Sequence, residues 1–359
     1  MDDAQHPSDA SSIIALVHGR TDIGRAREHN EDAFVAADFA TLAPLDPLPA
    51  TLRFGTLEPG PLLMVADGMG GAAAGEIASA MAVDAVLHAL GEADLASAAA
   101  DPDRFAAALR SVVEAANERI HTHAVANLAH RGMGTTATVA VTVGDTLYVA
   151  QVGDSRAYLV RNGEARQLTK DQSLIQKLID DGELTPEEAE RSERRNIILQ
   201  ALGPEALVRV DVTHQRLRRG DAVIVCTDGL SGLVSASELA SAAADEPTVA
   251  DVCDRLIGAA NAAGGFDNIT VVAARFDGAG LASPTTGDEV GYRPVGGVTT
   301  SIWRATPAAA LARILTPAGV PTVDSTPEAH VARRSVGPVY ALLAAAFVVL
   351  AVLAVLRLV

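Results

Sequence analysis

Four acidic turns lie next to strand-like apolar runs, and their residue types suit the binding of hard metal ions. The four carboxylates are Asp67, Asp154, Asp228 and Asp267. Carboxylate oxygens are the ligands that Mg²⁺ and Mn²⁺ prefer, and the glycines near them allow close approach of another backbone or a ligand. One Asp-Gly pair would be an ordinary turn. Four such turns over about 200 residues predict convergence on one site.

A fifth acidic segment, Asn30-Glu31-Asp32, lies near the N-terminus, and Arg27 precedes Glu31 by four residues. A site built of carboxylates selects Mg²⁺ or Mn²⁺ over Zn²⁺. Two such cations suit hydrolysis of a phosphate ester, because they generate hydroxide near neutral pH and neutralise charge in the transition state. The planar guanidinium of Arg27 could hold the phosphate oxygens. These residues therefore predict phosphoryl chemistry.

Other chemistries fit the sequence less well. The run Gly68-Met69-Gly70-Gly71 resembles a phosphate-cradling loop, but it lacks the lysine and the spacing of a Walker motif. No Gly-x-Ser-x-Gly pattern surrounds Ser155, which argues against a serine nucleophile. His121 and His123 are two residues apart on a predicted helix, so they point to different faces and are not expected to share a metal.

The charge balance bears on possible partners. The chain of 359 residues has a formal net charge of -17, and because residues 277–359 carry six arginines and five acids, residues 1–276 carry -18. So acidic a body is a poor match for nucleic-acid phosphates, and no nucleic-acid partner is expected. The only cysteines, Cys226 and Cys253, indicate no disulfide framework, which fits a reducing compartment.

The elements that must position the acidic turns are grouped by type along the chain. Strands are predicted near residues 13–19, 33–37, 61–66, 134–143, 146–152, 156–161, 207–216, 221–227 and 268–276. Helices are predicted near residues 76–90, 102–127, 173–180, 186–191, 237–244 and 249–262. This grouping favours an α+β fold over alternating βαβ units. The proline-rich residues 43–61 are expected to form a surface loop between two strands.

The C-terminal part of the chain has a different composition. A catalytic body is predicted over residues 13–276, and residues 277–334, rich in Gly, Pro, Ser and Thr, predict a flexible linker. Residues 336–357 are almost wholly apolar and long enough for a transmembrane helix. A buried core helix is the alternative, but such a helix would rarely follow a long polar linker. Arg333 and Arg334 precede the helix and no signal peptide is apparent, so a single-pass membrane protein with a cytoplasmic catalytic domain is expected.

Six short motifs together resemble the metal-dependent, type 2C serine/threonine protein phosphatases in their bacterial form. The motifs are Arg27-Glu28-His29-Asn30-Glu31-Asp32, Asp67-Gly68-Met69-Gly70-Gly71 with Ala74-Gly75-Glu76, Gly132-Met133-Gly134-Thr135-Thr136, Gly153-Asp154-Ser155-Arg156, Thr227-Asp228-Gly229-Leu230-Ser231 and Gly265-Phe266-Asp267-Asn268-Ile269-Thr270. They occur in the family's order over residues 15–276. The resemblance implies a four-layer α-β-β-α sandwich, in which two central antiparallel sheets are flanked by helices.

The resemblance also implies individual roles and an activity. Asp67 would bridge two catalytic Mn²⁺ or Mg²⁺ ions, with Asp228 and Asp267 completing one site and Glu31 and the Gly68 carbonyl the other. Asp154, with Asp228, would form a third, weaker site. Asp32 would support the attacking water, and Arg27 would bind the substrate phosphate. Residues 170–201 would form a flap beside the site.

The activity implied is removal of phosphate from phosphoserine and phosphothreonine, with phosphorylated proteins, a serine/threonine kinase and its substrates as partners. Some relatives carry a histidine after the Asp-Gly pair to protonate the leaving group, whereas this chain has Met69. The group that protonates the leaving group is therefore not assigned, and the two candidates are a metal-bound water and His29. A non-catalytic phosphoprotein-binding scaffold and a hydrolase of small phosphate esters are the two competing hypotheses.

Overall fold

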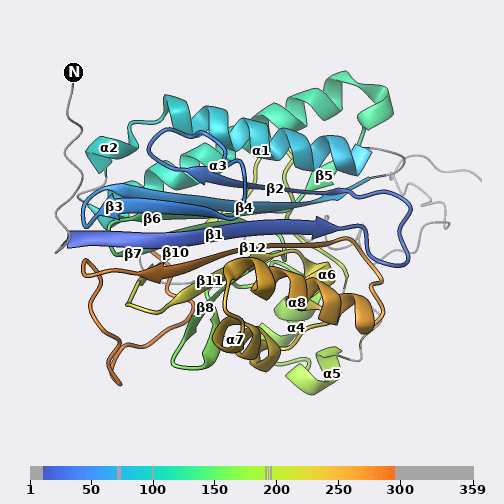
Figure 1. Ribbon diagram of the computed structural model, residues 1–359. Coiled ribbons are helices and arrows are strands. Elements are labelled where there is room, and N and C mark those ends of the chain that lie inside the picture. The colour runs from blue at the N-terminus through green and yellow to red at the C-terminus, as the bar shows by residue number, and fades with distance from the viewer. Residues whose placement is uncertain are drawn as a thin grey trace, which may run out of the picture. The chain divides into compact units, whose positions relative to one another are not determined.

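The computed structural model describes residues 11–70, 74–98, 101–190, 192, 194 and 196–295. Within these ranges two antiparallel sheets lie face to face in the middle of the molecule (Figure 1). Helices cover the outer face of each sheet. The predicted α+β sandwich with four layers is therefore confirmed.

The first sheet contains six strands, and every neighbouring pair is antiparallel. In spatial order they are β3 (Ala50–Gly55), β1 (Ser12–Asp22), β12 (Ile269–Asp277), β11 (Ala222–Cys226), β8 (Arg156–Arg161) and β9 (Glu164–Gln167). Helices α7 (Ala236–Asp245) and α8 (Val249–Ala262) cover its outer face. The short helix α6 (Asp228–Ser231) follows β11 directly.

The second sheet is also antiparallel. Its strands are β10 (Asp211–Arg216), β7 (Thr146–Val152), β6 (Ala137–Val143), β4 (Pro59–Met69) and β2 (Asp32–Asp38), and β5 (Gly134–Thr135) pairs with the end of β4. Helices α1 (Ala74–Glu92) and α3 (Pro102–Ala126) lie on its outer face, with the short α2 (Leu95–Ala98) and the 3₁₀ turn Leu128–His130 nearby.

The apolar pattern of β4 explains why four layers form. Successive side chains of a strand point to opposite faces of the sheet. Leu62 and Met64 pack toward the helices α1 and α3, whereas Leu63 and Val65 pack between the two sheets. A strand that is apolar on both sides needs a cover on both sides, so the helices and the other sheet are both required.

Helix α5 (Pro186–Glu190) begins as its sequence predicts. Thr185 accepts a hydrogen bond from the backbone N–H of Glu188 at 3.2 Å, and the Glu188 carboxylate accepts one from the Thr185 N–H at 2.9 Å. This reciprocal capping box, with proline in the first turn, fixes the helix start. Together with α4 (Leu174–Asp180), α5 forms the predicted flap segment.

Two expectations about connecting segments are corrected. The region 43–61 is not only a loop, because it contains strand β3, which pairs with β1 at the edge of the first sheet. The prolines at 44, 47 and 49 all precede the strand, and an edge strand tolerates such neighbours. The predicted linker is described over residues 277–295: Asp277 ends strand β12, and residues 278–295 are packed on the body.

We call residues 278–295 the C-terminal strap. Its residue Leu281 is 1% exposed, and its Asp288 forms a two-pronged ion pair with Arg218 at 2.7 and 3.0 Å. Near its end, the Val295 N–H donates to the carbonyl of Val212 in the edge strand β10. The folded body thus extends to residue 295 in the described part of the chain.

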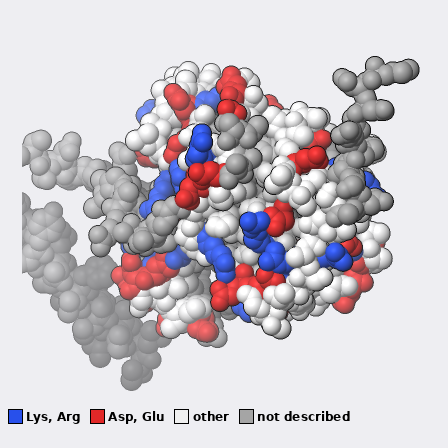
Figure 2. All heavy atoms as spheres, turned by 90° about the vertical axis from the view of Figure 1, so that its left-hand side faces the viewer, with Lys and Arg blue, Asp and Glu red and all other residues white. Residues whose placement is uncertain are grey.

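The surface does not show one uniform sign of charge. On the face drawn in Figure 2, basic and acidic side chains are interspersed, although the whole chain is acidic. No helix among the described residues is long and apolar enough to cross a bilayer. The predicted membrane helix at 336–357 and most of the predicted linker lie outside the described residues.

Candidate metal centre

The fold brings the predicted carboxylates to one end of the two sheets. Asp32 begins β2 and lies directly opposite Asp67 of β4 in the strand register. Asp228 begins α6 just after β11, and Asp267 lies two residues before β12. Asp154 lies in the connection between β7 of one sheet and β8 of the other. Both sheets therefore contribute to the cluster.

Asp32 is held by the opposite sheet. Its Oδ2 accepts hydrogen bonds from the hydroxyls of Thr227 at 2.9 Å and Thr270 at 2.7 Å. Thr227 follows β11 and Thr270 lies in β12, so these bonds tie the two sheets together at the site. The sequence motifs contain both threonines, but their role depends on a contact across the sandwich that sequence spacing does not show.

Three carboxylate oxygens in the cluster are buried and have no hydrogen-bond partner among the described residues. They are Oδ1 of Asp32, Oδ1 of Asp154 and Oδ1 of Asp228. A buried polar atom without a partner is costly and calls for a bound water or ion. Divalent cations at Asp154 and Asp228, with a cation-bound water at Asp32, would satisfy all three atoms, so these residues fit the predicted metals.

The raised pKa values of the clustered carboxyl groups also support metal binding at this site. Burial raises the pKa of Asp32 to about 7, although the hydroxyls of Thr227 and Thr270 oppose the shift. Burial also raises the pKa of Asp67 and that of Asp154 well above the usual range, and neighbouring carboxylates add to both shifts. The pKa of Asp228 is raised mainly by burial and then by Asp267. Bound cations would supply the missing positive charge and displace the protons.

The carboxylates do not already form a closed coordination shell. Among the described residues, no group of three or more His, Cys, Asp or Glu side chains is arranged to hold a metal as it stands. The Arg27 guanidinium donates to Asp267 Oδ2 at 2.7 Å. Asp267 would therefore have to share or exchange its arginine partner on binding a cation.

Glu31 and Gly68 meet at the start of α1. The Gly68 N–H donates to the carbonyl of Glu31 at 3.0 Å, and the Glu31 N–H donates to the side chain of Asn268 at 2.8 Å. A Cβ at Gly68 would lie 2.1 Å from the carbonyl oxygen of Gly75, and one at Gly75 would lie 2.7 Å from the Glu31 carboxyl carbon. Only glycine allows these three backbones to approach so closely.

Asn268 connects three segments beside the candidate ligands, and the sequence assigned it no role. Its amide donates to the carbonyls of Ile23 at 3.0 Å and His29 at 2.9 Å, while its oxygen holds Glu31. It thereby connects the loop containing Arg27 and Glu31 to the strand β12. Its position next to Asp267 was the one sequence signal for this role.

The structure does not support a serine nucleophile at Ser155 or a metal shared by His121 and His123. Ser155 is fully buried, and its hydroxyl is hydrogen-bonded to that of Thr136 at 2.7 Å. His121 bonds to the carbonyl of Gly203, while His123 bonds to His130. These two histidines therefore use different partners, in agreement with the prediction from their spacing.

A cavity of about 680 Å³ adjoins the carboxylates and the flap. Arg27, Asp154, Asp228 and Asp267 line it together with residues of α4 and α5. Arg156 forms three hydrogen bonds of 2.6 to 3.0 Å with Asp171, and this partly buried pair fixes the strand β8 to the start of the flap. The predicted flap therefore borders the same space as the candidate metal ligands.

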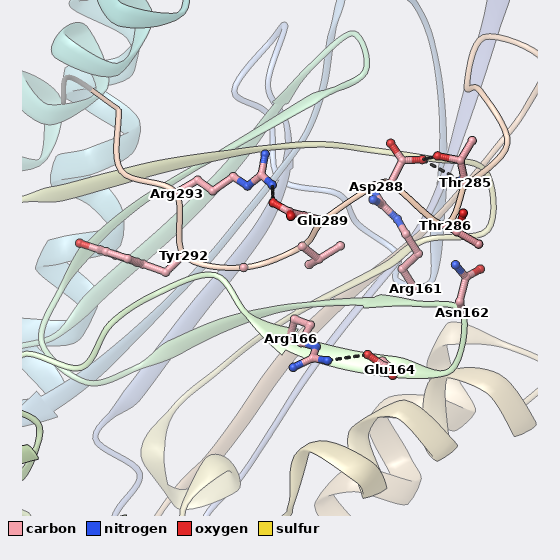
Figure 3. Close-up of a pocket in the computed structure, with 12 residues that line it drawn as sticks. Arg161, Asn162, Glu164, Arg166, Thr285, Thr286, Asp288, Glu289, Tyr292 and Arg293 are labelled. Atoms are coloured by element: carbon pink, nitrogen blue, oxygen red, sulfur yellow. Dashed lines mark hydrogen bonds and ion pairs between the residues drawn. The ribbon is translucent and has the colours of Figure 1, made fainter. Parts of the chain in front are cut away.

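A second cavity of about 590 Å³ lies between the β8–β9 hairpin and the C-terminal strap (Figure 3). Its charged residues are paired locally: Arg166 with Glu164, Arg293 with Glu289, and the deeply buried Arg161 with Asp221. None of the predicted site residues lines this cavity. We therefore assign the chemistry to the first cavity.

Comparison with known proteins agrees with this fold and site. Residues 50–268 match the family model for Protein phosphatase 2C. The serine/threonine phosphatase stp of Listeria monocytogenes is 36% identical over 253 residues, which cover 70% of this chain and 92% of that protein. The serine/threonine protein phosphatase PstP of Mycobacterium tuberculosis is 38% identical over 268 residues, covering 73% of this chain and 45% of PstP.

Solved structures show the same similarity. The crystal structure of Mycobacterium tuberculosis PstP/Ppp has a TM-score of 0.60 and 35% identity, covering 74% of this chain and 99% of that one. A structure of the PstP catalytic domain in complex with two manganese ions has a TM-score of 0.58 and 34% identity, with the same two coverages. The chain belongs to the protein phosphatase 2C family.

Proposed function

We propose that this protein is a metal-dependent protein phosphatase that hydrolyses the phosphate monoesters of phosphoserine and phosphothreonine, with Mn²⁺ or Mg²⁺ as cofactor. The observation that carries this conclusion is the buried carboxylate cluster, in which three oxygens lack partners among the described residues. The manganese-containing structure of a related catalytic domain supports the choice of metal. When bound, the two cations would make water nucleophilic near neutral pH and neutralise charge on the phosphoryl group.

The individual ligand roles are those that the family resemblance implies, and the clustering of the side chains supports them. Asp67, at the centre of the mutual repulsion among the carboxylates, would bridge the two cations. Asp228 and Asp267 would complete one site. Glu31 and the Gly68 carbonyl, which meet beside Gly75, would complete the other. Asp154 would contribute to a third, weaker site.

Two further residues would act on the substrate and the water. Asp32 is anchored through Oδ2, and its Oδ1 has no partner in the described part of the chain, so it would accept a hydrogen bond from the attacking water and orient it. Arg27 would bind the phosphate oxygens, since its guanidinium already binds the carboxylate of Asp267. A phosphate dianion would compete with that carboxylate for the same donor groups.

The direct test is phosphate release from a phosphothreonine peptide by the purified full-length protein with Mn²⁺. We expect turnover that stops on addition of a chelator and returns with excess Mn²⁺. Small phosphate esters at equal concentration form the comparison. Faster turnover of the small esters, with none of the peptide, would favour the alternative of a small-ester hydrolase.

We also propose that the protein opposes a membrane-bound serine/threonine kinase from the cytoplasmic side of the membrane, through a C-terminal anchor at residues 336–357. The support is the apolar composition of that segment and the preceding Arg333 and Arg334. A shared membrane surface would raise the effective concentration of enzyme and substrate. Truncation after residue 334 should move the protein from the membrane fraction to the soluble fraction and leave peptide turnover unchanged.

A further inference from the structure

Phe266 is an exposed aromatic side chain at the edge of the catalytic cavity. Its side chain is 61% exposed, and it is the one large exposed hydrophobic residue among those described that lines this cavity. It directly precedes Asp267, which binds Arg27. An exposed aromatic ring beside a charged site has no stabilising role in the core, which suggests a role in binding.

The chain on both sides of Phe266 is anchored, and the ring packs against its own backbone. A Cβ at Gly264 would lie 2.4 Å from the Cζ of Phe266, so the ring lies against the backbone of that glycine. Before Phe266 in the chain, the Gly265 carbonyl accepts a hydrogen bond from the Arg25 N–H at 2.7 Å. After it, the Asn268 side chain donates to the carbonyls of Ile23 and His29. An aromatic ring fixed before binding loses little entropy when a partner packs on it.

The cavity wall contains six other apolar residues among its polar and charged ones. Ile175 and Ile179 of α4, Pro186 and Ala189 of α5, and Leu233 and Val234 after α6 all line the same space. The charged residues of the site would engage the phosphate group. The apolar residues have no role in phosphoryl chemistry, although they line the same cavity as the candidate metal ligands.

We propose that Phe266 is a specificity-determining residue that binds an apolar side chain of the substrate protein close to the phosphorylated residue. Because Phe266 is adjacent to Asp267, and an extended chain advances about 3.3 Å per residue, this side chain belongs to one of the three residues on either side of the phosphoresidue. The inference rests on the proposed function and adds a preference for an apolar neighbour.

The test uses full-length protein with Mn²⁺ and fluorescent peptides that carry a non-hydrolysable phosphonate analogue of phosphothreonine. In each peptide one position, from three before to three after the analogue, carries leucine among serines, and an all-serine peptide is the reference. We expect tighter binding of at least one leucine peptide by the wild type. Phe266→Ala should weaken that peptide about tenfold, and Phe266→Leu should retain most of the difference. Binding of the all-serine peptide should not change.

Leu57→Ala is the matched control, because Leu57 is 88% exposed and does not line the cavity. It should leave every affinity unchanged. Equal affinities for leucine and serine peptides in the wild type, or an equal loss for all peptides in Phe266→Ala, would overturn the inference. Turnover of the corresponding phosphothreonine peptides separates the two claims: if the wild type hydrolyses none of them, the proposed function itself fails.

Discussion

At the scale of single residues, the carboxylate of Asp32 is held by the hydroxyls of Thr227 and Thr270 from the opposite sheet. We therefore expect Thr270 to be a positioning residue for Asp32. In Thr270→Val the side chain keeps its shape but loses the 2.7 Å hydrogen bond to Asp32. This bond favours the charged carboxylate, so its loss should raise the pKa of Asp32 further. We expect about a tenfold lower kcat and an acid limb of the pH–rate profile that moves to higher pH.

Thr146→Val is the control for this prediction, since the Thr146 hydroxyl bonds only to its neighbour Asp145 among the partners described, at 3.2 Å. A purely structural role for Thr270 would lower the melting temperature and leave the pH profile in place. That result would remove Thr270 from the catalytic arrangement.

Asp228 gives a second prediction at the scale of residues. Its buried carboxylate should lower the stability of the metal-free protein, and it should be required for turnover when metal is bound. Asp228→Asn should lower turnover at least about a thousandfold, since a cation ligand is lost. The same change removes one charge from a group of buried, mutually repelling carboxylates, so the metal-free protein should not lose stability. Melting curves with chelator and with Mn²⁺ measure both effects; a mutant that Mn²⁺ stabilises as much as the wild type would contradict the assignment.

At the scale of elements, Gly68 and Gly75 allow the start of α1 to lie close to the candidate metal ligand Glu31. Gly68→Ala would place a Cβ 2.1 Å from the carbonyl oxygen of Gly75 and 2.5 Å from that of Glu31. The backbones would have to separate, and we expect a loss of about 2 kcal/mol or more in the free energy of unfolding. Turnover should fall about a hundredfold or more, because Glu31 moves with its backbone.

Gly258 is the matched control for this substitution. It lies in α8, where an added Cβ would meet no heavy atom within 4 Å. Gly258→Ala should therefore stabilise the protein by about 0.5 to 1 kcal/mol through helix propensity alone. Urea denaturation of both variants measures the contrast, and similar stabilities would show that the close approach at Gly68 is not needed.

Much of this architecture could be predicted from the sequence, for reasons that differ between elements. The strands β4, β7 and β11 are continuous apolar runs followed by acidic turns, and the capping box at Thr185 is a local signal. Strand β3 was missed because prolines precede it and its pairing with β1 is a long-range contact. The end of the folded body was also missed, because the composition of the C-terminal strap is that of a linker.

For the candidate site, the sequence predicted the carboxylates that the fold brings together. It did not predict Thr270 and Asn268 as supporting residues, because their contacts cross from one sheet to the other. Nor did it predict the ion pair of Arg27 with Asp267, since those residues lie 240 positions apart.

At the scale of the whole molecule, the carboxylate cluster should make stability depend on pH when metal is absent. The pKa of Asp32 is raised from 3.8 to about 7 in the folded state. The stability it contributes is fully present below the unfolded pKa and is lost as pH rises through the folded pKa. Between these values each carboxyl group that is protonated only in the folded state lowers the free energy of unfolding by about 1.4 kcal/mol per pH unit.

Denaturation of the chelated protein at pH 5 and pH 8 checks this dependence. We expect lower stability at pH 8, a weaker slope in Asp32→Asn, and the largest stabilisation by Mn²⁺ at the higher pH. Equal stability of the chelated wild type at both values would mean that the cluster does not hold protons.

The central claim is that these carboxylates bind two catalytic cations with Asp67 between them. Equilibrium dialysis of the full-length protein against Mn²⁺, followed by metal analysis, tests it most directly. We predict at least two ions per chain in the wild type and loss of both tight sites in Asp67→Ala. Undiminished manganese binding by Asp67→Ala, or none by the wild type, would contradict the claim.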